Sequence, residues 1–172
     1  MLAAAVLCGC SNPDAPAGST VRRPVVSGSA GEPPAPRPLS PGSQSPAEVQ
    51  ASPQAALSLF ARRYINWSYR TLSADQWRLA AMAVGPARLA ERQAAASSRT
   101  DVTLRRGRVF NRGQVVSVAR DRARRGWWVI VTREQTGGSG EYEGLPAAFH
   151  VTLARLARLT GGYAVETWSP QS

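Results

Sequence analysis

The sequence contains no lysine, only one histidine and only two cysteines, and these shortages exclude several kinds of site. All 21 basic side chains are arginine, against 11 acidic ones, which gives a formal net charge of +10. We attribute the missing lysine to codon usage and draw no functional conclusion from it. Cys8 and Cys10 are too few for a disulfide framework, and together with His150 they are too few for a zinc site. We therefore expect no metal and no cofactor.

Long apolar runs are also absent. No run approaches the roughly 18–20 residues that span a bilayer as a helix, so a polytopic membrane protein is excluded, and composition excludes collagen and a coiled coil. Residues 1–50 carry three arginines and three acids, whereas residues 51–172 carry 18 arginines and eight acids. The whole net charge therefore lies on the C-terminal 51–172 segment, which is long enough for one hydrophobic core but not for two.

The first ten residues, MLAAAVLCGC, are apolar and small, and a polar turn-forming stretch follows them. This length fits the apolar core of a secretory signal, about 7–15 residues. Leu7-Cys8-Gly9-Cys10 resembles the bacterial lipobox, in which cleavage precedes a cysteine that then carries the lipid. The resemblance implies an exported lipoprotein with palmitate-type chains on Cys10, held at the extracytoplasmic face of the cell membrane. No basic residue precedes the apolar core, so the alternative is an ordinary N-terminus with two inert cysteines.

Residues 11–50 contain nine prolines, four glycines and seven serines, half of the 40 positions. Such a stretch cannot bury enough apolar surface to offset the entropy of ordering, so we expect a disordered tether. A spacer between the anchor and the domain is the simplest use of it, and recognition of its proline motifs by a partner is the alternative.

Helices are expected in the first part of the domain, 51–172. Pro53 opens an amphipathic segment of about four turns with Leu57, Phe60 and Tyr64 on one face. Ser73 and Gln76 match a capping box for a second helix that begins at Ala74. A third helix is expected from Pro86 to about Ala96, with Leu89 directed inward.

Strands are expected after residue 100, where the period changes from 3.6 to 2. The pattern predicts a hairpin of residues 101–110 and 114–120 joined by a turn at 111–113. Further strands are predicted at 127–133, 149–153 and 163–168, with turns at 121–126 and 160–162 and a Gly-rich loop at 136–146. Helices followed by antiparallel strands indicate an α+β class, with the helices packed on a curved sheet.

This order of elements, over residues 53–170, resembles the nuclear transport factor 2-like superfamily, whose sheet wraps around its helices as a cone. Within it, the chain is similar to the extracytoplasmic domains of conjugal-transfer and type IV secretion assembly proteins, which also follow an anchor and a linker. The resemblance rests on element order and not on a signature motif.

No group of residues matches a catalytic motif, and we expect no enzymatic activity. In a cone-like fold, Tyr64, His150 and Tyr163 are the candidates to line a pocket, which would make the domain a small-ligand-binding or enzymatic module. A lone histidine on a strand is more commonly structural, and both tyrosines also fit a core. No carboxylate lies near His150 in sequence.

Eight arginines fall between residues 105 and 125, against one acid, Asp121, and the predicted hairpin places them together. Such a ribbon could dock on anionic lipid or polymer, or bind nucleic acid through phosphates. The alternative is a solvated hairpin whose charges prevent edge-to-edge aggregation. The residues are Arg105, Arg106, Arg108, Arg112, Arg120, Arg122, Arg124 and Arg125.

The sequence therefore favours a lipid-anchored, non-enzymatic binding or assembly module at the cell surface, with a protein partner, as part of a conjugal-transfer or secretion apparatus. The two alternatives are the ligand-binding or enzymatic cone and nucleic-acid binding through the arginine-rich hairpin.

Overall fold

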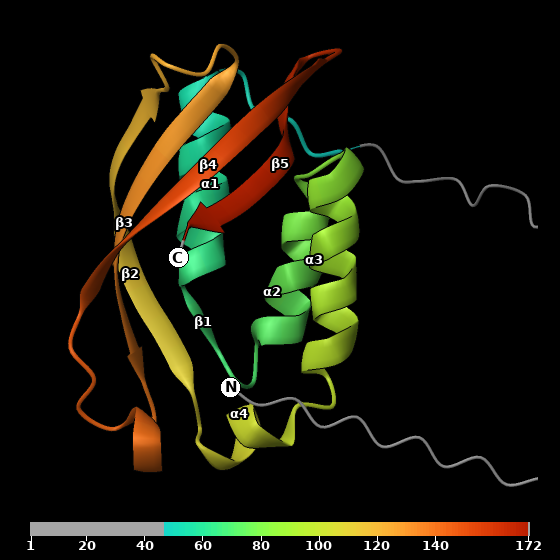
Figure 1. Ribbon diagram of the computed structural model, residues 1–172. Helices are drawn as coiled ribbons and strands as arrows, with labels where there is room; N and C mark the ends of the chain where they lie inside the picture. Colours follow the sequence, from blue (N-terminus) through green and yellow to red (C-terminus); the bar gives the residue numbers. More distant parts are fainter. Residues whose placement is uncertain (1–46, 172) are drawn as a thin grey trace, which may run out of the picture. The chain divides into compact units, whose positions relative to one another are not determined.

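Helices come first along the chain and a sheet follows, in a computed structural model that describes residues 47–171 (Figure 1). The helices are α1 (Pro53–Ile65), α2 (Leu72–Ala81), α3 (Gly85–Ser98) and α4 (Val102–Arg106). The strands are β1 (Trp67–Ser68), β2 (Phe110–Arg120), β3 (Trp127–Gly137), β4 (Ala148–Leu159) and β5 (Gly162–Gln171), with the short 3₁₀ helix η1 (Gly140–Tyr142) between β3 and β4. The predicted α+β class is confirmed.

The sheet is antiparallel throughout, in the order β1-β2-β3-β4-β5. Register shifts interrupt it between Val115 and Ser117 on β2 and between Arg155 and Leu156 on β4. Such bulges increase the local twist and bend a strand. The sheet curls around α1, while α2 and α3 lie side by side beyond β5 (Figure 1).

The core lies between α1 and the concave face of the sheet. Pro53 begins α1 as predicted, with the Ser52 side chain accepting a hydrogen bond from the Ala55 backbone N–H. Phe60 is fully buried, and its ring lies 4.8 Å from that of Trp168 on β5. The other buried members of this cluster come from α1, the segment of α2 and α3, and strands β3 to β5: Leu57, Ala61, Leu79, Met82, Ala83, Ala87, Trp128, Ile130, Ala154 and Val165.

The capping box predicted at Ser73 is wrong. The helix begins two residues earlier than predicted, at Leu72, and Thr71 is its N-cap. The Ser73 hydroxyl instead donates to the carbonyl of Ala95, at 2.8 Å, and Gln76 accepts from the Ser98 hydroxyl, at 2.7 Å. Both side chains therefore join α2 to α3, because that contact competes successfully with the local cap.

The predicted hairpin of residues 101–120 is also wrong. Asp101 caps α4 by accepting a hydrogen bond from the Leu104 backbone N–H, so residues 102–106 are helical. Residues 111–113 lie inside β2, which pairs with β3 over its length. Gly113 is needed for close approach and not for a turn, since a Cβ there would lie 2.6 Å from the Arg133 carbonyl oxygen.

The third helix extends further than predicted, and its alanines Ala87 and Ala95 face inward as expected, but the inward position predicted for Leu89 is wrong. Leu89 is 60% exposed, whereas Arg88 and Glu91 are buried with Ala87 and Ala95. Arg88 is satisfied by donating from Nε to the carbonyls of Ala80 and Ala83 at the end of α2. The polarity of Arg88 and Glu91 therefore did not predict that both lie on the inner face of this helix.

The turns at 121–126 and 160–162 are confirmed. Asp121 accepts hydrogen bonds from the backbone N–H groups of Ala123 and Arg124, and Gly126 and Gly161 take positive φ angles of 83° and 89°. The loop expected from residue 136 is shorter, because β3 continues to Gly137.

The described chain begins inside the predicted tether. Glu48 donates its backbone N–H to the Ala81 carbonyl, and Gln50 pairs with Tyr163 at the start of β5. The predicted signal segment, Cys10 and most of the tether lie outside the described residues. Within residues 47–171 no helix is both long and apolar enough to cross a membrane.

We expect Gly113→Ala to destabilise the domain by about 1–3 kcal/mol, because the new Cβ collides with the backbone of β3. Urea unfolding of the full chain measures this loss. Gly140→Asn is the control, since Gly140 has a φ of 66°, which asparagine tolerates, and open space around it. Equal losses in both variants would contradict the role assigned to Gly113.

Candidate functional site

A cavity of about 450 Å³ lies between α1, α2 and α3 and the concave face of the sheet. Its walls come from every helix and from four strands. The residues that line it are Arg63, Tyr64, Trp67, Leu72, Asp75, Gln76, Leu79, Glu91, Leu104, Asn111, Glu134, Thr136 and His150. This volume is within the range of small-molecule sites.

Glu134 is held in a fixed position on the sheet side of the cavity. Its carboxylate accepts hydrogen bonds from the Asn111 amide at 2.7 Å and from the Thr132 hydroxyl at 2.5 Å. The Asn111 amide also donates to the Ile65 carbonyl, and its oxygen accepts from the Thr136 hydroxyl. These bonds tie β2 and β3 to the end of α1 and orient one carboxylate toward the cavity.

Glu91 enters the cavity from α3 and is only 6% exposed. No hydrogen bond or ion pair connects it to another residue in the part of the chain that the structure describes. Burial raises the pKa of its carboxyl from 4.5 to about 7. Glu91 is therefore a buried acid whose charge no side chain of the described fold neutralises.

Tyr64 lies between the two acids and the aromatic core. Its ring is 5.4 Å from that of Trp168 and 6.5 Å from that of Phe60. Burial, followed by the charges of Glu91 and Glu134, raises the pKa of its phenol above 10. The phenol stays protonated at neutral pH and is available as a hydrogen-bond donor.

The helix α2 contributes a third acid, Asp75, which is already paired. The Arg78 guanidinium lies 2.7 Å from its carboxylate. Arg63 on α1 also lines the cavity, and no ion pair joins it to the acids in residues 47–171.

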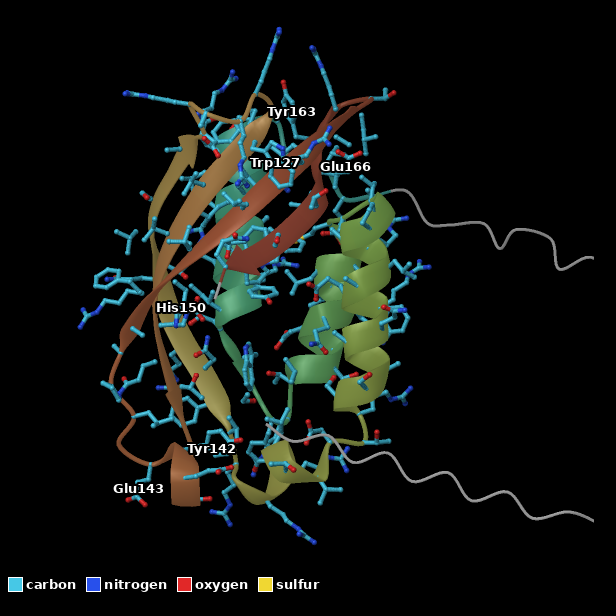
Figure 2. The ribbon with its side chains drawn as sticks, in the orientation of Figure 1. Trp127, Tyr142, Glu143, His150, Tyr163 and Glu166 are labelled. Carbon is cyan, nitrogen blue, oxygen red and sulfur yellow. The ribbon has the colours of Figure 1, made fainter. Side chains whose placement is uncertain are left out.

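Two of the three residues predicted for a pocket line this cavity. Tyr64 and His150 do so, with His150 exposed at its edge, opposite Thr132 in the register of β3 and β4. Tyr163 does not, because it pairs with Arg158 and Gln50 at the far end of β5, well away from His150 in Figure 2.

Glu91 and Glu134 were not predicted as site residues from the sequence, although the periodic pattern of each element indicates that they face inward. Glu134 continues the alternation of Trp128, Ile130 and Thr132, which places it on the concave face. Glu91 follows Ala87 and precedes Ala95 by four residues, which places it on the buried stripe of α3.

The eight arginines do not form one surface. Arg105 and Arg106 lie on α4, with Arg108 and Arg112 close behind in sequence. The other group lies about 30 Å away for a strand of this length, at the opposite end of β2 and in the turn before β3 (Figure 1). It consists of Arg120, Arg122, Arg124 and Arg125. Binding of anionic lipid, polymer or nucleic acid by either group stays a prediction.

Within residues 47–171, no three His, Cys, Asp or Glu side chains lie close enough together to hold a metal ion. The cavity instead offers carboxylates, a phenol and apolar walls. The carboxylates accept hydrogen bonds and attract positive charge, and the phenol can donate a hydrogen bond.

No protein-family model matches the sequence, and no curated protein is significantly similar to it. Among solved structures, the fold is similar to that of the Agrobacterium tumefaciens VirB8 protein. The two share 13% sequence identity with a TM-score of 0.51, and the match covers 69% of this chain and 90% of that one. The fold is nuclear transport factor 2-like. The resemblance drawn from element order is therefore confirmed for the architecture.

We expect Glu91→Gln to stabilise the domain increasingly as pH rises. The folded-state pKa of about 7 lies above the ordinary 4.5, so the stability associated with protonated Glu91 is complete below about pH 4.5 and is lost as pH rises through 7. The variant lacks this loss, and its melting temperature should exceed that of the wild type by about 10 °C at pH 8.

Thermal unfolding at pH 4, 6 and 8 measures this difference. Glu143→Gln, which replaces an exposed carboxylate, serves as the control. A difference between Glu91→Gln and wild type that stays constant over this range would contradict the assignment.

Proposed function

We propose that the protein is a lipid-anchored, non-enzymatic assembly module of a conjugal-transfer or type IV secretion apparatus, at the extracytoplasmic face of the cell membrane. The observation that carries this proposal is the structural match to VirB8, a type IV secretion protein, over 90% of that chain. The N-terminal Leu7-Cys8-Gly9-Cys10 sequence supports the anchored location.

The convex face of the sheet offers a surface for a protein partner. Phe149 is 67% exposed and Val151 is 40% exposed on β4. Val151 pairs with Val131 and Leu153 pairs with Val129, so the apolar side chains continue across two strands. Since aromatic residues and arginine are enriched in protein interfaces, this face suits an assembly role.

Arginines border this apolar strip. Arg133 pairs with Phe149, and Arg155 lies over the Trp127 ring at 5.8 Å from its centre. A partner that covers the strip would therefore need apolar residues at its centre and acidic ones at its rim.

A non-enzymatic role agrees with the surroundings of His150. It lies exposed on β4, and within residues 47–171 it donates no hydrogen bond to a carboxylate that would orient it. General-base catalysis by histidine normally depends on such an orienting partner.

We expect Cys10→Ala, or treatment of the producing cells with globomycin, to abolish membrane retention of the full-length protein. Without the acceptor thiol no lipid is attached, and residues 47–171 contribute no spanning helix. Fractionation with carbonate washing measures retention, with Cys8→Ala as the matched control. Finding the native protein in the cytosol with an unmodified Cys10 would contradict the anchor.

We expect Phe149→Glu to lower transfer or secretion by about tenfold or more by placing a charge in the centre of the interface. Leu89→Glu is the matched control, because Leu89 is similarly exposed but lies on α3. A photocrosslinker at position 149 should capture a component of the apparatus, and one at position 89 should not. Normal transfer from cells that lack the protein altogether would overturn the proposed function.

A further inference from the structure

Glu91 occupies a position in the fold where an acid is unfavourable. It projects from the buried stripe of α3, between Ala87 and Ala95, and is 6% exposed. A buried carboxylate without a partner costs free energy that alanine at the same site would not. No described residue supplies a partner, so the carboxylate form is left to a charge or donor that enters the cavity from outside the fold.

The charge of the cavity is opposite to that of the chain. The sequence as a whole carries a net charge of +10, yet the lining contains three carboxylates and a single arginine, Arg63. Arg78 already pairs with Asp75, which leaves Glu91 and Glu134 facing the same space. Both lie close enough to Tyr64 to perturb its phenol.

The rest of the lining suits an organic molecule. Leu72, Leu79 and Leu104 supply apolar surface, and the Trp67 indole supplies a ring face that attracts cations. The volume of about 450 Å³ accommodates a small ligand with an apolar body.

We propose that this cavity binds a small organic cation, a protonated primary amine on an apolar body, with the ammonium between Glu91 and Glu134. The ammonium would donate hydrogen bonds to both carboxylates, and the apolar part would lie against the leucines of α2 and α4. Glu134 is held in place for this contact by Asn111 and Thr132. The site goes beyond the proposed assembly role and does not depend on it.

Other ligand classes fit less well. A metal ion would need a closer cluster of ligands than residues 47–171 provide. An anion would be repelled by the two carboxylates, and a neutral apolar molecule would leave Glu91 buried and unpaired.

Three probes of equal chain length test the proposal on the full-length protein: hexylamine, 1-hexanol and hexanoate. Isothermal titration calorimetry should show binding of hexylamine, with hexanol and hexanoate weaker by about tenfold or more. Glu91→Gln should reduce the affinity for hexylamine by about tenfold or more, because it keeps the shape of the side chain and removes its charge. Glu143→Gln, at an exposed position that is not among the lining residues, should leave the affinity unchanged.

The position of the ligand is checked by the indole N–H resonances in two-dimensional NMR. Trp67 lines the cavity and should shift on titration, whereas Trp127 on the convex face should not. Absence of hexylamine binding, equal binding of hexanol, or full affinity in Glu91→Gln would each overturn the proposal. Phe149→Glu should bind hexylamine normally, which separates this site from the assembly surface.

Discussion

The packing of α1 into the curl of the sheet is the constraint on which the other features depend. Phe60 and Leu57 are fully buried at this contact, and the Trp168 ring closes over Phe60 from β5. The extra residues at the two register shifts, Val116 on β2 and Glu166 on β5, allow the strands to bend around the helix. Because α1 fills only one part of the concave face, the space beside Ile65 and Tyr64 is left for the cavity, with α2 and α3 as its outer wall.

The sheet wall of the cavity is polar because the apolar core residues of β3 end before the cavity begins. Along β3 the inward positions run from Trp128 and Ile130 through Thr132 to Glu134, so the concave face changes from apolar to acidic within one strand. The two halves of the same face thus serve different purposes. One half supplies the apolar burial that stabilises the fold, and the other carries the hydrogen-bonded polar groups that line the cavity.

Sequence patterns predicted the elements where local and tertiary preferences agree. Ser52 and Pro53 begin α1, and Asp121 and Gly126 make the turn into β3, since each acts through its own backbone. Prediction failed where a distant contact took precedence. Ser73 and Gln76 form hydrogen bonds with α3 and not with their own helix. Gly113 is required because the β3 backbone leaves no room for a side chain. The buried acids were missed because polarity was treated as evidence of exposure.

The antiparallel order of the strands places the β2–β3 and β4–β5 turns at the same end of the sheet, opposite α4 and η1 (Figure 1). Gln50 pairs with Tyr163 beside the β4–β5 turn, so the chain enters the fold at the same end of the sheet as the turn that carries Arg122, Arg124 and Arg125. The two arginine groups are therefore not equivalent. Any force or restraint transmitted through the preceding chain acts at the end with the turn, and the cavity and the α4 arginines lie distal to it.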